Sequence, residues 1–149
     1  MKQNDRIRLL QHVWLFERCS GKELASLASH ATPVRVQAGT ELTHEGDIGR
    51  EFFVMVSGKA SVARHGVEVG TLGPGSFFGE MALLDRLPRS ATVTTTELTD
   101  LLVLPTQAFT GVIETMPSVD RKMLTVLASR LRDVEARYLP DDQRLLTRT

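Results

Sequence analysis

The chain has 149 residues, of which 42% are hydrophobic and 24% are charged, and this balance is typical of one folded globular domain. Its 18 basic and 18 acidic residues cancel, which argues against the broad basic face that binding to nucleic acid or to an anionic membrane requires. The single cysteine, Cys19, excludes an internal disulfide. We expect a cytoplasmic protein, because the sequence has neither a signal-peptide pattern nor an apolar stretch approaching about 18 residues.

Residues 1–31 are predicted to form an N-terminal helical segment. Apolar residues recur there at spacings of three or four, which indicates one apolar stripe; they are Ile7, Leu10, Val13 and Trp14. A second helix is expected to begin at the run Ser-Gly-Lys-Glu of residues 20–23, because this run has the pattern of a capping box.

Between residues 32 and 105, short β-prone runs alternate with turn residues. We expect strands at residues 34–36, 41–43, 51–56, 60–63, 67–72, 92–96 and 100–104. Short strands separated by regularly placed glycine turns are typical of an antiparallel sandwich or barrel. The continuous apolar run of residues 52–56 predicts a strand with both faces covered, and Arg64-His65-Gly66-Val67 predicts a tight hairpin.

Residues 106–139 are predicted to return to helix. A short helix is expected at residues 107–115 and a longer one at about residues 119–139. Pro117 lies near the start of the longer helix, where a missing N–H is harmless. The longer helix carries a heptad-like stripe, which consists of Leu124, Leu127, Leu131, Val134 and Tyr138. Two interpretations stay open. The helix packs on its own barrel, which we favour because the stripe spans only about two heptads, or it forms the seam of a homodimer.

Residues 77–93 carry the clearest chemical pattern in the chain. Glycines around Pro74 lead into this stretch, and Gly79 lets the backbone approach a ligand closely. Glu80 opens a helix-like turn whose N–H groups favour an anion. Further along, Arg89 supplies a planar, permanently charged fork for phosphate oxygens. The pattern indicates a site for a small phosphorylated ligand.

The runs Phe-Gly-Glu-Met-Ala-Leu at residues 78–83 and Pro-Arg-Ser-Ala at residues 88–91 resemble the phosphate-binding cassette of cyclic nucleotide-binding domains. That family includes cAMP receptor protein and the regulatory subunits of protein kinase A. The resemblance implies a mainly β fold, an eight-stranded double-sheet jelly-roll barrel with N-terminal helices and C-terminal lid helices. Such a roll is compatible with an internal ligand cavity. Residues 1–149 would then form a single domain, with the roll at 32–105, the cassette at 77–91, helices at 106–139 and a tail at 140–149.

The resemblance also implies roles for the cassette residues. The Glu80 carboxylate would accept a hydrogen bond from the ribose 2′-hydroxyl, and Arg89 would pair with the equatorial oxygen of the cyclic phosphate. The backbone N–H groups of Ala82 and Ser90 would donate to the same phosphate. The implied ligand contacts in the cassette are Gly79, Glu80, Met81, Ala82, Arg89, Ser90 and Ala91. Candidates for contacts with the base are Val69 and Gly70 on the preceding strand and Arg132 and Tyr138 on the long helix.

We therefore expect a regulatory sensor that binds cAMP or cGMP, with cAMP preferred on family frequency, and that repacks its C-terminal helix on binding. No cofactor, metal or catalytic residue is expected, so the chain is predicted not to be an enzyme. Its partner would be a protein effector or a fused domain. Residues 140–149 are too few for a helix-turn-helix module, so we expect no binding to nucleic acid by this chain alone. Whether the chain stands alone or is a fragment stays open.

Two other functions are compatible with a jelly roll. A scaffold that had lost its ligand would be expected to lack the equivalents of Glu80 or Arg89, and both are present. A cupin-like metal enzyme needs a cluster of histidines with ligand spacing. The four histidines stand in separate segments, at His12, His30, His44 and His65.

Overall fold

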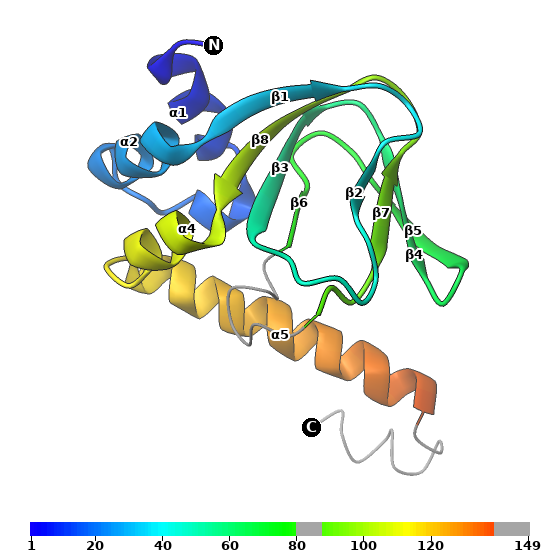
Figure 1. Ribbon diagram of the computed structural model, residues 1–149. Helices are drawn as coiled ribbons and strands as arrows, with labels where there is room; N and C mark the ends of the chain where they lie inside the picture. The colour runs from blue at the N-terminus through cyan, green and yellow to red at the C-terminus, as the bar shows by residue number, and fades with distance from the viewer. Residues whose placement is uncertain (80–87, 139–149) are drawn as a thin grey trace.

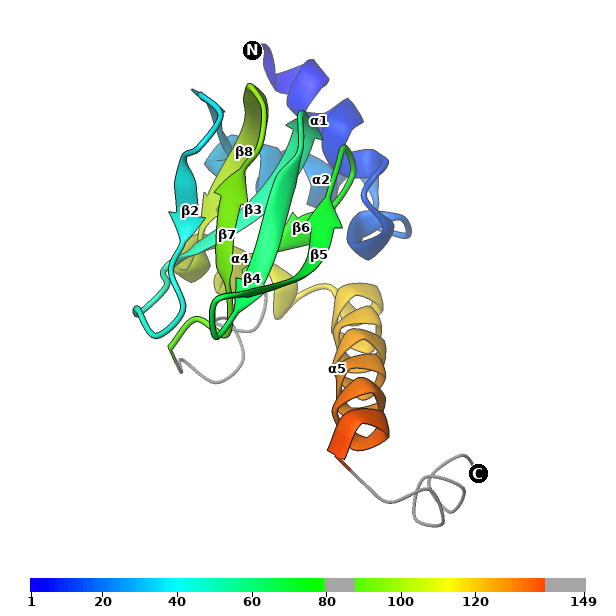
Figure 2. The ribbon, with the colours of Figure 1, turned by 90° about the vertical axis from the view of Figure 1, so that its right-hand side faces the viewer.

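The computed structural model describes residues 1–79 and 88–138 of the chain. Two four-stranded antiparallel sheets face each other, and the helices α1, α2 and α4 gather beside the first of them (Figure 1). The long helix α5 (Pro117–Tyr138) extends beyond the sandwich, as the view turned by 90° makes plain (Figure 2). The predicted mainly β, double-sheet fold with flanking helices is confirmed.

The eight strands of the described residues divide evenly between the sheets. The first sheet has the order β1-β8-β3-β6, with bounds Thr32–Val36, Thr99–Pro105, Glu51–Ser57 and Phe77–Phe78. The second has the order β2-β7-β4-β5, with bounds Glu41–Thr43, Thr92–Thr95, Ala60–Arg64 and Val67–Leu72. All seven strands expected from the sequence are present, with ends that differ by at most two residues. The two-residue strand β6 was not expected, because so short a run shows no periodicity.

Strand β3 is covered on both faces, as its apolar run predicts. Phe52 and Val54 pack toward the helices, whereas Phe53 and Met55 pack into the core between the sheets. All four side chains are at most 5% exposed. Because successive residues of a strand point to opposite faces, β3 connects the two cores of the molecule.

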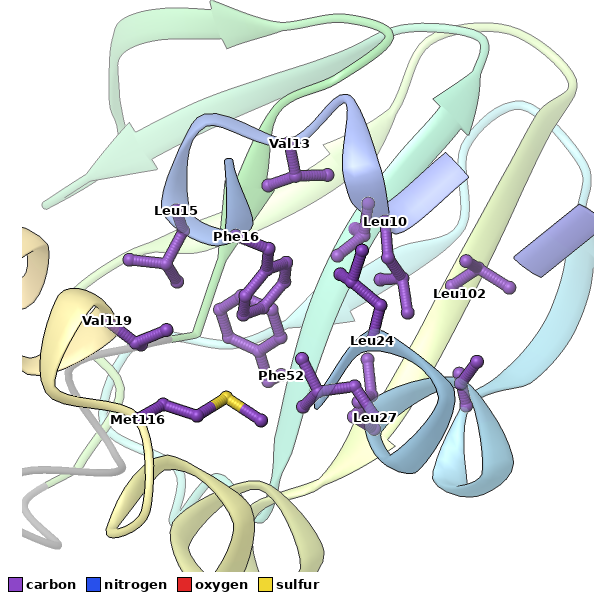
Figure 3. Close-up of a cluster of buried hydrophobic side chains, with 14 of the residues drawn as sticks. Leu10, Val13, Leu15, Phe16, Leu24, Leu27, Phe52, Leu102, Met116 and Val119 are labelled. Atoms are coloured by element: carbon purple, nitrogen blue, oxygen red, sulfur yellow. The ribbon is translucent and has the colours of Figure 1, made fainter. Parts of the chain in front are cut away.

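The core outside the first sheet joins the two ends of the chain (Figure 3). Its helices are α1 (Gln3–Gln11), the 3₁₀ turn η1 (Trp14–Phe16), α2 (Gly21–His30) and α5, and α4 (Thr106–Ile113) lies against α2. Figure 3 shows Phe16 facing Phe52, with Met116 and Val119 beside them. The two rings meet edge to face at 6.1 Å and 70°, an arrangement that aromatic pairs favour. Side chains of β3 and of the start of α5 therefore belong to one packed cluster.

In the N-terminal segment the structure confirms the predicted helix cap and differs from the predicted apolar stripe. The capping box of α2 is confirmed, since Ser20 Oγ accepts a hydrogen bond from the Glu23 N–H at 3.1 Å and the Ser20 N–H donates to the Glu23 carboxylate at 2.8 Å. The predicted stripe is wrong at its end, because α1 stops at Gln11 and the chain turns through η1. Val13 is consequently buried, while Trp14 is 43% exposed.

Helix α5 begins at Pro117, two residues before the expected start at Val119. Its first turns pack on η1: Val119 and Met123 are buried, and the Lys122 ammonium lies 4.9 Å from the centroid of the Trp14 ring. Further along, Leu124 and Leu131 are 67% and 59% exposed, so the apolar stripe is uncovered at these two positions. In residues 1–79 and 88–138, no helix combines the length and the apolar character needed to cross a bilayer.

An ion pair joins β1 to β8 at the edge of the first sheet. Arg35 and Asp100 are directly opposite in register, and Arg35 Nε and Nη2 donate to the two carboxylate oxygens at 2.8 and 3.2 Å. The hydrogen bond from Arg35, supported by one from Ser57, lowers the pKa of Asp100. The pair therefore stabilises the fold above the pKa of the unfolded carboxyl, and this contribution is lost as the pH falls through the lower pKa of the folded state.

We expect Asp100→Asn to lower the free energy of unfolding at pH 7, and we expect its difference from the wild type to shrink as the pH falls below about 4. Urea unfolding measured across this pH range tests the prediction. Arg35→Gln removes the guanidinium donors of the ion pair, so its difference from the wild type should show the same pH dependence. A difference that stays constant down to about pH 2 would contradict this account of the pair.

Candidate functional site

Arg89 is fixed at one end of the sandwich by the loop between β2 and β3. Its N–H donates to the carbonyl oxygen of Asp47 at 2.7 Å, and its own carbonyl oxygen accepts from the Gly46 N–H at 2.9 Å. Because both bonds involve backbone atoms, they hold the Cα of Arg89 whatever its side chain contacts.

The half-buried Arg89 side chain lies against the end of the first sheet. Its Nη2 donates to the Glu51 carbonyl oxygen at 2.7 Å, and its Nη1 donates to the Gly79 carbonyl oxygen at 3.4 Å. The guanidinium carbon is 5.9 Å from the centroid of the Phe53 ring, and that ring stacks on Phe78 at 4.7 Å in the core between the sheets. Carbonyl oxygens carry no formal charge, and these two contacts orient the guanidinium.

Two glycines make this position accessible to the guanidinium. Gly79 has a φ of +91°, and a Cβ there would lie 2.6 Å from the Glu51 carbonyl oxygen. A Cβ at Gly49 would lie 1.7 Å from Arg89 Nε. Gly79 was predicted from the sequence, whereas Gly49 and the carbonyl of Glu51 were not. The only signal for Gly49 is a second glycine in the run Glu-Gly-Asp-Ile-Gly of residues 45–49.

The structure brings together some of the predicted cassette residues. Gly79 and Arg89 are hydrogen bonded, Ser90 is exposed, and the carbonyl oxygen of Ala91 accepts from Thr43 Oγ1 at 3.0 Å. Three further predicted contacts lie outside the described residues, so their roles stay predictions: Glu80, Met81 and Ala82.

The candidates for base contacts differ in their surroundings. Gly70 is exposed; it pairs with Val62, which packs against the core between the sheets, so the two residues share one face of the sheet. A Cβ at Gly70 would meet no neighbouring atom of the described chain within 4 Å, which leaves room there. Val69 lies where the register of β4 and β5 shifts, and it is 42% exposed. Arg132 is exposed on α5, and Tyr138 ends that helix with a side chain outside the described set.

The histidines do not gather into a metal site. His44 Nδ1 lies 2.6 Å from the Glu41 carboxylate, and His65 Nδ1 lies 3.5 Å from that of Glu45. Throughout residues 1–79 and 88–138, no three histidine, cysteine, aspartate or glutamate side chains are arranged to hold a metal ion. A cupin-like centre therefore finds no support in the part of the chain that the structure describes.

Residues 33–116 match the family model of the cyclic nucleotide-binding domain. The match covers more than half of the chain and contains strands β2 to β8 together with Gly49, Gly79 and Arg89. The chain belongs to the cyclic nucleotide-binding domain family.

Individual relatives agree with this assignment. A cyclic AMP receptor protein of Thermus thermophilus is 36% identical over 102 residues, which cover 65% of this chain and 47% of the relative. A cAMP-dependent protein kinase regulatory subunit of Dictyostelium discoideum is 34% identical over 113 residues, covering 70% of this chain and 33% of the subunit. The crystal structure of the Thermus thermophilus catabolite activator protein aligns with a TM-score of 0.74 at 32% identity, over 83% of this chain and 60% of that one. The matched part of this chain spans less than half the length of the Thermus receptor protein and of the Dictyostelium regulatory subunit.

We expect Gly49→Ala to displace the Arg89 guanidinium while leaving the fold in place, because the new Cβ would overlap the flexible end of a side chain rather than backbone. Affinity for a cyclic nucleotide should fall about tenfold or more, which corresponds to about 1.4 kcal/mol. Calorimetric titration measures the affinity, and thermal unfolding checks the fold.

Gly73→Ala is the matched control, since a Cβ at Gly73 meets nothing within 4 Å among the described residues. Wild-type affinity in Gly49→Ala would mean that the guanidinium position seen here is not used for binding.

Proposed function

We propose that this chain is a regulatory sensor domain for a cyclic nucleotide, with cAMP as its ligand and cGMP as the alternative. Membership of the family supports a cyclic nucleotide, and the names of the Thermus and Dictyostelium relatives support cAMP. The observation that carries the proposal is the Arg89 guanidinium, held by two backbone carbonyl oxygens in a space that only glycines at positions 49 and 79 leave open.

In the proposed binding mode Arg89 pairs with the cyclic phosphate, because a guanidinium fork matches phosphate oxygens and its hydrogen bonds to them are charge-assisted. Glu80 accepts from the ribose 2′-hydroxyl. The N–H groups of Ala82 and Ser90 donate to the phosphate. The remaining proposed contacts are Gly79, Met81 and Ala91 around the sugar phosphate, and Gly70 with Val69 beside the base. Arg132 and Tyr138 stay the proposed contacts from α5.

The proposed response is a repacking of the C-terminal helices, transmitted through β3. Phe53 on one face of this strand lies beside the Arg89 guanidinium, and Phe52 on the other face packs in the same cluster as Met116 and Val119. An anion that draws Arg89 and the cassette inward acts on the face of β3 that carries Phe53. The C-terminal helices pack on the face of β3 that carries Phe52. The ligand favours the rearranged state only by its difference in affinity for the two states.

We propose a role without catalysis, in which a protein effector or a fused domain receives the signal in the cytoplasm. The relatives are a receptor protein and a regulatory subunit, which supports regulation rather than turnover. A scaffold without ligand is the alternative, and the retained Gly79 and Arg89 contact argues against it. The division into helices at 1–31, a roll at 32–105 and helices at 106–139 stays our proposal for the domain.

Replacing Arg89 by Ala should weaken cAMP binding by about 2–5 kcal/mol, as expected when one partner of a desolvated charge pair is removed. This energy is about thirtyfold to several thousandfold in Kd. Isothermal titration with cAMP and cGMP in parallel measures the loss. Arg8→Ala, at an exposed position of α1, is the control for a change of net charge. Equal affinity in the wild type and Arg89→Ala would refute the phosphate anchor.

We also propose a parallel homodimer through α5 as the second candidate role of that helix. Leu124 and Leu131 are largely exposed and lie seven residues apart, which is the repeat of a coiled-coil seam. The double variant Leu124→Glu/Leu131→Glu should sediment as a monomer at concentrations where the wild type sediments as a dimer. A wild type that remains monomeric at about 100 μM, a weak-dimer threshold, would contradict the seam.

A further inference from the structure

A groove of about 500 Å³ lies between the 3₁₀ turn η1 and the first turns of α5. The two elements pack against each other, since Leu15 of η1 and Val119 of α5 belong to one buried cluster and are neighbours in Figure 3. None of the residues that hold Arg89 lines the groove. Its lining is mostly polar and basic, and includes Trp14, Arg18, Pro117, Ser118, Arg121 and Lys122.

Lys122 connects the two walls of this groove. Its side chain is only 13% exposed, and its ammonium donates to the carbonyl oxygen of Trp14 and lies 3.3 Å from the Glu17 carboxylate. The same ammonium lies 4.9 Å from the centroid of the Trp14 ring, within the range of a cation–π contact. Because Glu17 is the carboxylate in the lining, the negative charge of the groove is already paired.

Two positive charges of the groove stay uncompensated. Arg18 and Arg121 both line it and are both exposed. Within residues 1–79 and 88–138, neither guanidinium has an acidic partner. A guanidinium is charged at every physiological pH and presents a planar fork that matches a carboxylate, so the groove is complementary to acidic groups.

Trp14 adds an apolar surface beside these charges. It is 43% exposed between the buried residues Val13 and Leu15. Tryptophan and arginine are the residue types that most often dominate the binding energy at protein interfaces. The chain as a whole carries no net charge, and two arginines are a small footprint for nucleic acid, which neutralises several phosphates at once. The groove therefore favours a short acidic peptide segment with an apolar side chain.

We infer that this groove docks an acidic segment of a protein partner, with an apolar side chain on Trp14 and carboxylates on Arg18 and Arg121. That the partner is the effector rests on the proposed sensor function, because η1 and the start of α5 contribute to the packing that the nucleotide is proposed to change. If both ligands act on this packing, each changes the affinity of the other by the same factor.

Trp14 is the only tryptophan of the chain, so its fluorescence reports occupancy of the groove directly. The probe is an acetylated and amidated pentapeptide with one leucine flanked on each side by two glutamates. We expect it to shift the Trp14 emission with a Kd on the order of 100 μM. The same peptide with glutamine in place of glutamate should bind about tenfold more weakly or worse, because it lacks the charges.

The double variant Arg18→Gln/Arg121→Gln should lower the affinity for the acidic peptide about tenfold or more. Arg8→Gln/Lys59→Gln is the matched control, since it removes two exposed positive charges that do not line the groove. The control should keep the wild-type affinity within about twofold. Thermal unfolding checks that both variants fold.

The inference is overturned if the acidic peptide causes no saturable change of emission up to about 1 mM, or if the glutamine peptide binds equally well. Equal losses in the two double variants would also overturn it, because net charge rather than the groove would then attract the peptide. A wild-type dimer that Arg18→Gln/Arg121→Gln dissociates in sedimentation, with no peptide binding by the wild type, would assign the groove to a second copy instead.

Repeating the titration with saturating cAMP separates this inference from the proposed function. We expect the affinity for the peptide to change severalfold when cAMP is bound, and an unchanged affinity would overturn the assignment of the partner as the effector. If cAMP binds and the acidic peptide does not, the docking groove is wrong and the proposed function stands. If the peptide binds and no cyclic nucleotide does, the proposed function fails and the docking groove stands.

Discussion

A single guanidinium group, held against two backbone carbonyl oxygens, organises the end of this sandwich. Arg89 is fixed at its backbone by Asp47 and Gly46 and at its side chain by Glu51 and Gly79. A charge oriented before a ligand arrives loses little conformational freedom on binding, so more of the interaction energy appears as affinity. The fold therefore holds one cation in a defined position, and the glycines at 49 and 79 are the sequence features that permit this position.

The same end of the molecule is connected to the helices by the alternation of one strand. The Phe53 ring centroid lies 5.9 Å from the guanidinium carbon of Arg89. The neighbouring residue Phe52 packs with Phe16 in the core that also contains Met116. Close-packed side chains transmit displacements because they leave little empty space to absorb them. The geometry thus offers a route from an anion at one face of β3 to the helices on its other face, without any contact between ligand and helix being required.

Much of the fold was predictable from the sequence because the informative signals are local. The capping box at Ser20 and Glu23, the hairpin at His65 and Gly66, where both residues have positive φ, and the doubly apolar run of β3 each follow from neighbouring residues. The parts that were missed are non-local. The role of Gly49 depends on a side chain 40 residues away. Trp14 was misplaced because spacing alone does not reveal that α1 ends at Gln11.

The most direct test of the central claim is a crystal structure of this chain grown with cAMP. The account predicts a nucleotide at the end of the sandwich, with a phosphate oxygen about 2.7–2.9 Å from an Arg89 guanidinium nitrogen, the usual length of a charge-assisted bond. A nucleotide bound elsewhere, with the Arg89 guanidinium still contacting the carbonyls of Glu51 and Gly79 and no phosphate, would contradict it.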